Sequence, residues 1–171
     1  MGSLGELFWN ARGSSVVYEG KTVFRIDRFP VKNGDKLKFC IESTNSPFPQ
    51  GFAVDIEGKC ECRGEIWKKG KRVKMIFWED AQLVDPKNIE ITVFTNKDFV
   101  VINNLWEVEY PDVSAGLYQE NFNMKKRTDS WTGDCGMLIE EIPNGRRYRC
   151  NDGRPSSSFD SIVFTVKKVN L

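Results

Sequence analysis

Hydrophobic and polar residues alternate along much of the chain, the pattern of strands that bury one face. In residues 36–42 (KLKFCIE), Leu37, Phe39 and Ile41 fall on one face, while the charged residues fall on the other. Residues 89–95 (IEITVFT) repeat the pattern. Because this alternation is typical of antiparallel sheets with one face on a core, both segments are predicted to be half-buried antiparallel strands.

Turn sequences separate the alternating segments. Asn33-Gly34 and Asp152-Gly153 are examples of pairs that supply the positive φ angles of tight turns, and Asn144-Gly145 predicts the turn of a hairpin. Strands then recur about every 10 to 15 residues, as in a sandwich. We expect about ten to twelve strands, near residues 15–18, 22–27, 36–43, 51–57, 60–67, 72–79, 89–95, 99–106, 136–142, 146–151 and 161–168.

Two stretches interrupt this rhythm. Residues 46–51 (SPFPQG) contain two prolines and predict a stiff, extended corner. Residues 107–135 show no clean periodicity and are expected to be irregular, with a short helix near 115–121 as one option and Ser114 as its N-cap. The predicted fold is all-β: a single-domain antiparallel β-sandwich over residues 1–171, with partial closure as a variant. The irregular segment would drape over one end or edge.

Composition narrows the classes of function. The 25 basic and 24 acidic residues nearly cancel, so no global attraction to nucleic acid or to an anionic membrane is expected. The short basic run 68–72 surrounds Gly70 and predicts a solvated hairpin tip. The chain has no histidine, which excludes Ser-His-Asp and Cys-His catalysis and histidine-ligated zinc. We therefore expect a protein that is not an enzyme and carries no cofactor.

The cysteines and the apolar runs point to the cytoplasm. The chain has 5 cysteines and no CxxC pair, and the lone Cys60-x-Cys62 pair lacks two further ligands at metal-site spacing. Reduced thiols and no metal site are expected. No apolar run approaches the roughly 18 residues of a membrane span, and the first residues do not resemble a secretion signal. A cytoplasmic protein without a membrane partner is predicted.

An arginine-rich stretch, residues 146–150 (RRYRC), is one candidate site. On a strand, Arg147 and Arg149 would share one face, and Arg146 and Tyr148 the other. The arginines could form a pocket for phosphate or for a partner's carboxylates. Alternatively, Arg146 and Arg149 pair across the hairpin with the acidic residues Glu140, Glu141 and Asp152.

Tryptophan is the other candidate for binding, with 5 in the chain. Trp67, Trp78 and Trp106 lie in or at the ends of predicted strands, so core or core-rim packing is expected for them. Trp131 lies in the polar loop 127–134 (RTDSWTGD). It could anchor a partner or a sugar ring, or fold back onto the core as part of a lid. The residues expected at the contact are Trp131, Asp129, Asp134, Arg146 and Arg147.

The last third of the chain carries a resemblance, in residues 135–141 (CGMLIEE), 147–153 (RYRCNDG) and 159–164 (FDSIVF). These stretches resemble the C-terminal part of small β-rich bacterial proteins. In size and character the chain is similar to immunity proteins of bacterial toxin systems, which bind and block a cognate toxin. The resemblance implies a cytosolic inhibitor whose partner is a protein and not a nucleic acid.

Two other functions stay open at this point. One is a carbohydrate-binding β-sandwich that uses tryptophans as sugar platforms. The other is a histidine-free hydrolase that uses a pair of carboxylates on glycosyl or ADP-ribosyl bonds, although no spacing singles out such a pair.

Overall fold

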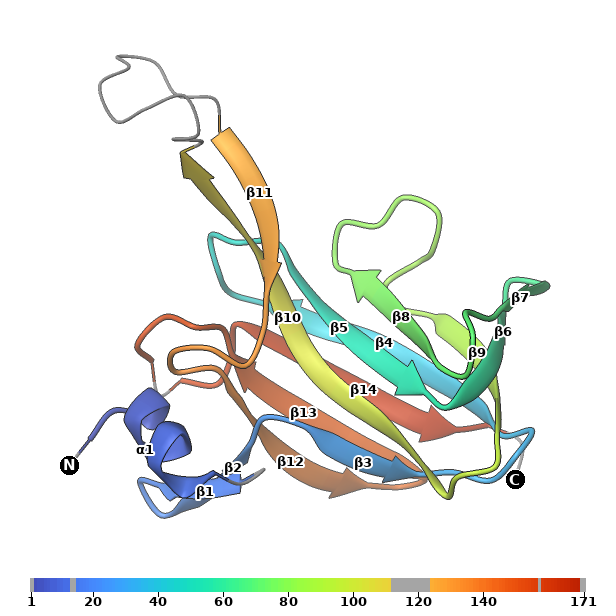
Figure 1. The fold of residues 1–171 in the computed structure, drawn as a ribbon, viewed down its shortest axis with the longest axis horizontal. Helices are drawn as coiled ribbons and strands as arrows, with labels where there is room; N and C mark the ends of the chain where they lie inside the picture. Colours follow the sequence, from blue (N-terminus) through green and yellow to red (C-terminus); the bar gives the residue numbers. More distant parts are fainter. Residues whose placement is uncertain (1, 13–14, 112–123, 157, 170–171) are drawn as a thin grey trace.

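Two antiparallel sheets packed face to face make up the structure, a computed structural model that describes residues 2–12, 15–111, 124–156 and 158–169 (Figure 1). The predicted all-β sandwich is confirmed. Within the described residues neither sheet closes on itself, because each runs between two different edge strands.

Sheet A is the larger and contains nine strands in the order β1-β2-β12-β13-β14-β4-β9-β6-β7. In β4 and β9 the predicted alternation holds, with Leu37, Phe39 and Ile41 buried on the inner face. The bounds are β1 Ser15–Tyr18, β2 Lys21–Phe24, β4 Lys36–Thr44, β6 Gly58–Cys62, β7 Glu65–Trp67, β9 Ile89–Thr95, β12 Gly136–Ile142, β13 Gly145–Asn151 and β14 Ile162–Lys168.

Sheet B has the strand order β11-β10-β5-β8, with β3 also paired to β10. The long strand β10 pairs with β5 through residues 101–106, with β3 through 99–102 and with β11 through 106–111. On the far side of β5, strand β8 is the edge of the sheet. The bounds are β3 Asp27–Pro30, β5 Gln50–Ile56, β8 Val73–Trp78, β10 Phe99–Pro111 and β11 Met124–Asp129.

Stacked aromatic rings join the two sheets. Phe52 of sheet B lies 4.9 Å from Phe39 and 4.6 Å from Phe164 of sheet A, measured between ring centroids. All three side chains are fully buried. Burial of one such side chain contributes about 1.5–3 kcal/mol, and truncation of a buried phenylalanine to alanine costs about 3–5 kcal/mol. The core between the sheets is therefore the main source of stability.

A short helix that the sequence pattern did not indicate opens the chain. Helix α1 spans Leu4–Ala11 and starts with a capping box, in which Ser3 Oγ accepts the Glu6 N–H and Glu6 Oε2 accepts the Ser3 N–H. It buries Leu4 and Phe8, a single i, i+4 pair, which is too little to produce visible helical periodicity. Among the described residues no helix is long and apolar enough to cross a membrane.

The prediction that residues 107–135 are irregular is wrong for much of the segment. Strand β10 continues to Pro111, residues 124–129 form β11, and the two pair antiparallel. Residues 107–111 and 124–129, called the arm below, project from the body of the sandwich (Figure 1). Alternation is missing from β11 because nearly all its side chains are exposed, so no face selects apolar residues. The predicted helix 115–121 and its cap Ser114 lie outside the described residues.

The hairpin between β12 and β13 turns one residue earlier than predicted. Ile142 pairs with Gly145, so the turn residues are Pro143 and Asn144, and Asn144 has a φ of 64°. Proline followed by a residue with positive φ is typical of a type II turn. Gly145 is instead the first strand residue, where a Cβ would collide with the carbonyl oxygen of Val166.

Candidate functional site

Arg146 points inward and is neutralised by acidic residues of its own chain. Its Nη1 lies 2.9 Å from Asp27 Oδ2, and its Nε lies 2.8 Å from Glu141 Oε1. The guanidinium also lies over the ring of Phe29. Tyr148 donates its hydroxyl to the same Asp27 at 2.5 Å, and burial raises the pKa of Tyr148. These contacts tie sheet A to β3.

Arg147 and Arg149 share one face of β13, as predicted, and this is the outer face of sheet A; both are also paired. Arg147 Nε is 2.6 Å from Glu42 Oε1, and its Nη1 is 3.1 Å from Glu140 Oε2. Arg149 Nε is 2.6 Å from Glu140 Oε1. Hydrogen bonds from Arg149 and Arg147 hold the pKa of the Glu140 carboxyl below its ordinary value. The pairing hypothesis explains these arginines better than an open anion pocket.

The expected contact residue Asp134 is buried. Its Oδ1 accepts the Gly5 N–H of α1 at 2.8 Å, close to the positive end of the helix. Arg25, which sequence reasoning did not single out, donates to the carbonyl oxygens of Trp131 and Gly133 at 2.5 and 2.6 Å. Its guanidinium also lies over the ring of Phe8. Asp134 and Arg25 thus dock the loop after β11 onto the helix.

Trp131 remains at the surface, with 48% of its side chain exposed. Its φ of 59° is unusual for a bulky residue, and the Arg25 contact to its carbonyl helps to hold that conformation. The ring faces Lys74 of β8, whose Nζ lies 5.8 Å from the ring centroid. Trp131 therefore reaches toward the β8 edge of sheet B.

The five expected contact residues divide into two places. Trp131 and Asp134 belong to the loop between β11 and β12, and Asp129 ends β11, where it pairs with Arg127 at 3.1 Å. Arg146 and Arg147 lie near the other end of the β12–β13 hairpin. Gly136, which begins β12 beside the loop, lies five residues along the strand from Glu141, the pairing partner of Arg146. This spacing corresponds to about 17 Å of extended strand. One surface centred on all five is therefore not formed.

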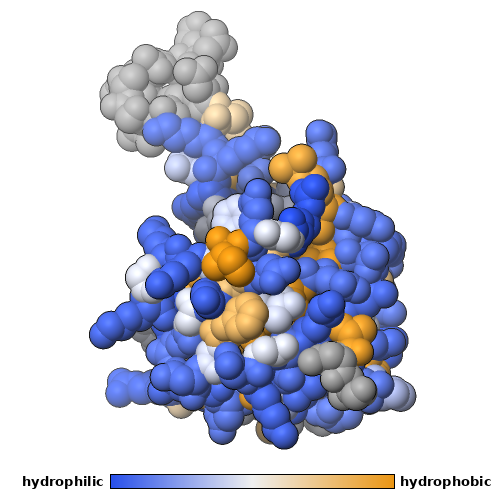
Figure 2. All heavy atoms as spheres, turned by 90° about the vertical axis from the view of Figure 1, so that its right-hand side faces the viewer, coloured by the Kyte–Doolittle hydropathy of each residue, from blue (hydrophilic) through white to orange (hydrophobic). Residues whose placement is uncertain are grey.

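A groove lies between the edges of the two sheets. Its two sides are strand β8 and the β6–β7 hairpin, whose places in the fold are seen in Figure 1. Its volume is about 520 Å³. Trp67 and Leu83 remain 45% and 79% exposed there, and apolar side chains reach the surface of this face among charged ones (Figure 2). We call it the β7–β8 groove; its apolar lining includes Cys62, Trp67, Met75, Phe77, Trp78 and Leu83.

Lysines surround the start of β8. The connection from β7 to β8 contains the exposed residues Lys68, Lys69 and Lys71, in agreement with the predicted exposure. The predicted hairpin is wrong, because β7 pairs with β6 in sheet A and β8 with β5 in sheet B. Beside this connection lies a second hollow of about 820 Å³, which Lys68 and Lys71 share with Lys59 and Lys97. The acidic residue in its lining, Glu57, is paired with Arg72 and Lys97. This end of the groove therefore carries a surplus of positive charge.

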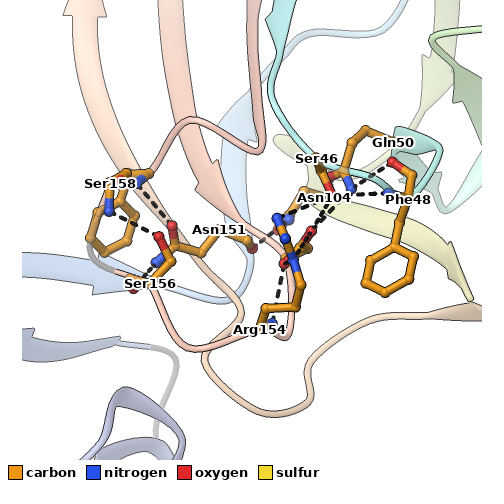
Figure 3. A network of polar contacts seen from close by, with 10 residues as sticks. Ser46, Phe48, Gln50, Asn104, Asn151, Arg154, Ser156 and Ser158 are labelled. Atoms are coloured by element: carbon orange, nitrogen blue, oxygen red, sulfur yellow. Dashed lines mark hydrogen bonds and ion pairs between the residues drawn. The ribbon is translucent and has the colours of Figure 1, made fainter.

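A network of polar contacts joins the predicted corner 46–51 to the loop that follows β13 (Figure 3). The buried Asp152 accepts hydrogen bonds from Ser46 Oγ at 2.6 Å, Gln50 Nε2 at 3.3 Å and Arg154 Nε at 3.0 Å. Asn151 accepts the Phe159 N–H at 2.8 Å. Asp152 is thus engaged by loop contacts and does not pair with the hairpin arginines.

Burial shifts the pKa of two thiols and of one carboxyl group. Burial raises the pKa of Cys60 to about 12 and that of Cys135 to about 11, so both thiols stay protonated near neutral pH. Burial also raises the pKa of Glu79, which accepts the Gln50 N–H. In the part of the chain that the structure describes, no three His, Cys, Asp or Glu side chains are grouped to hold a metal ion.

One groove residue was misassigned from the sequence. Trp67 was expected in the core or at its rim and is half exposed, whereas Trp78 is partly buried, which fits the expected rim, and Trp106 is buried as expected. A tryptophan directly before the basic tip 68–72 could have indicated an exposed strand end.

Searches against protein-family models, curated proteins and solved structures found no match.

Proposed function

We propose that this protein works by binding another protein through the β7–β8 groove, as an inhibitor or immunity-type protein that blocks a cognate toxin. The observation that carries the binding role is the exposed apolar lining of the groove, with Trp67 and Leu83 at its mouth. Exposed aromatic and aliphatic side chains beside a concave surface are typical of the anchors of protein interfaces.

The surroundings of the groove favour a protein over a small ligand. The groove lies between two sheet edges, and Lys74 of its lining faces the ring of Trp131, which extends the same surface over sheet B. Lysines at one end supply the charged rim that interfaces place around an apolar centre. Such a rim steers the encounter with an oppositely charged partner.

The inhibitor role rests on further grounds. The resemblance of the C-terminal third to immunity proteins supports it, and so does a histidine-free chain in which the buried thiols of Cys60 and Cys135 stay protonated near neutral pH. An inhibitor needs only to occupy a partner's active site, which takes surface area and complementary charge rather than chemistry of its own.

The test is capture from a lysate of the host organism with wild-type and variant protein, followed by binding measurements with the captured partner. Trp67→Ala combined with Leu83→Ala is expected to weaken binding at least tenfold. Trp9→Ala is the matched control, because Trp9 is 84% exposed on α1, away from the groove. Equal binding by all three proteins would contradict the site.

The inhibitor role has its own readout. An equimolar amount of the protein is expected to suppress the partner's toxicity or enzymatic activity. A partner that binds through the groove but keeps full activity would leave the protein a binding module and exclude the inhibitor role.

Carbohydrate binding is a second candidate, because Trp67 and Trp131 expose ring surface. Aromatic rings of this kind can stack on sugars. A change in tryptophan fluorescence across a glycan panel, lost in Trp131→Ala, would favour it, and a flat response across the panel would dismiss it.

A further inference from the structure

We propose that the partner contributes an extended segment that adds to sheet B as a new strand beside β8, with acidic residues at the end that lies against the 68–72 tip. This inference rests on the proposed protein-binding function and specifies how the β7–β8 groove is filled. Strand addition to a free sheet edge supplies main-chain hydrogen bonds, and alternate side chains enter the neighbouring pockets.

The first ground is the pairing of β8. Among the described residues it pairs with β5 alone, in the register Val73 with Ile56 through Trp78 with Gly51. Its opposite side therefore has backbone groups available for a further strand.

Hydrogen-bond alternation identifies which groups these are. The Glu79 N–H donates to the Gln50 carbonyl at 2.9 Å, in continuation of the same register. In an antiparallel pair every second residue bonds to the partner strand, so Phe77, Met75 and Val73 bond to β5. The N–H and C=O groups of Lys74 and Ile76 consequently point to the open edge, as does the N–H of Trp78.

The second ground is that the groove is shaped for alternate side chains. Met75 and Phe77 line it on the inner face of β8, and Trp67 faces them from the edge of sheet A. A strand placed beside β8 would direct every second side chain toward this apolar lining. The segment should therefore carry apolar residues at alternate positions.

The third ground is charge. Lys68, Lys69 and Lys71 precede β8, whereas Glu79 and Asp80 follow it. The charge thus changes sign along the strand. A segment whose acidic end lies against the lysines complements this arrangement, whereas the reversed segment would place its acidic end beside Glu79 and Asp80.

The experiment uses the isotope-labelled full chain and synthetic eight-residue peptides of alternating valine and threonine, with two glutamates at the amino or the carboxyl end. One glutamate-flanked peptide is expected to shift the amide resonances of Lys74 and Ile76 and to slow their hydrogen exchange at least tenfold. Methylation of one alternate set of peptide nitrogens should abolish binding, while methylation of the other set should change the Kd less than threefold.

Replacement of the glutamates by lysines is expected to weaken binding at least fivefold. Two variants separate the backbone from the side chain. Ile76→Pro removes the outward N–H, which an edge strand tolerates, and should lose binding with an unchanged circular dichroism spectrum. Ile76→Thr keeps the N–H and should bind within threefold of wild type.

The proposal is overturned if no peptide shifts these amides, if both methylated sets bind equally, or if Ile76→Pro binds like wild type. Protection of the same amides that rises with protein concentration without peptide would assign the edge to a second copy of the chain and also overturn it. A captured partner that needs Trp67 but is indifferent to Ile76→Pro would preserve the proposed function and remove only strand addition.

Discussion

Arg146 and Asp27 form an ion pair between the two sheets, in which one guanidinium nitrogen lies 3.1 and 2.9 Å from the two carboxylate oxygens. Arg146 belongs to β13 of sheet A and Asp27 to β3 of sheet B. Only 10% of the Asp27 side chain is exposed. Removing the arginine would leave this carboxylate without its charged partner in a nearly buried place, which is costly.

Arg146→Met is therefore expected to lower the free energy of unfolding by about 2–4 kcal/mol at pH 7. Arg149→Met is the matched control on the same strand. Its pair with Glu140 is well exposed, so a loss below about 1 kcal/mol is expected. Urea unfolding of both variants measures the difference. Equal losses would show that the Arg146–Asp27 pair contributes no more to the free energy of unfolding than the exposed Arg149–Glu140 pair.

A double variant checks the cause. Asp27→Asn combined with Arg146→Met should be less destabilised than the sum of the single variants, because the second change removes the charge that the first leaves unpaired. Additive losses would contradict the proposed coupling.

Asp134 is predicted to act on stability through helix α1. Asp134→Ala removes the acceptor of the Gly5 N–H and should cost about 1–2 kcal/mol, as loss of a helix cap does. Hydrogen exchange at Gly5 and along α1 should accelerate. Asp129→Ala, which removes an exposed pair with Arg127, is the control and should leave α1 unchanged. Unchanged exchange in both variants would contradict the docking role.

Alkaline pH is predicted to destabilise the protein through its buried thiols. The pKa of Cys135 is raised from 9.0 to about 11, so between these values the unfolded chain has lost a proton that the folded chain keeps. Because the unfolded state then binds fewer protons, the free energy of unfolding falls as pH rises. The loss begins near pH 9 and is complete near pH 11 for this thiol.

Urea unfolding under reducing conditions at pH 8 and pH 10.5 measures this loss. In Cys135→Ala the difference in free energy between the two pH values should be smaller by about 2 kcal/mol than in wild type. Cys40→Ala is the control, because Cys40 is only partly buried. The same pH dependence in all three proteins would exclude Cys135 as a source.

Strands that bury one face could be predicted from the sequence. Leu37, Phe39 and Ile41 alternate because the core selects apolar residues at every second position. Strand β11 was missed because neither of its faces meets the core, and backbone pairing to β10 alone defines it. Helix α1 was also missed, because it is too short to add periodicity; its one signal in the sequence is the Ser3-x-x-Glu6 spacing of a capping box.

The site was less accessible to prediction for a different reason. The sequence left two alternatives for Trp131, an exposed anchor or a lid folded onto the core, because polar neighbours in sequence do not decide between them. The groove depends on which strands become edges, so Trp67 looks like a core residue until the strand order is known. The pairing of Arg146 with Asp27 likewise joins residues 119 positions apart and depends on how the sheets pack.

The arm has a consequence for how the molecule can vary. The last pair of β10 with β5 is Trp106 with Gln50, and the N–H of Glu107 donates to the Pro49 carbonyl oxygen of the body at 3.0 Å. The pairs of residues 108–111 are with β11. Beyond Glu107 the arm can therefore be lengthened, shortened or exchanged for another hairpin without altering these hydrogen bonds between β10 and the body. Because a longer surface insertion adds little entropic cost, the scaffold can stay constant while the arm diverges. The side chains that the arm presents at the surface can thus change while the contacts that stabilise the sandwich stay the same.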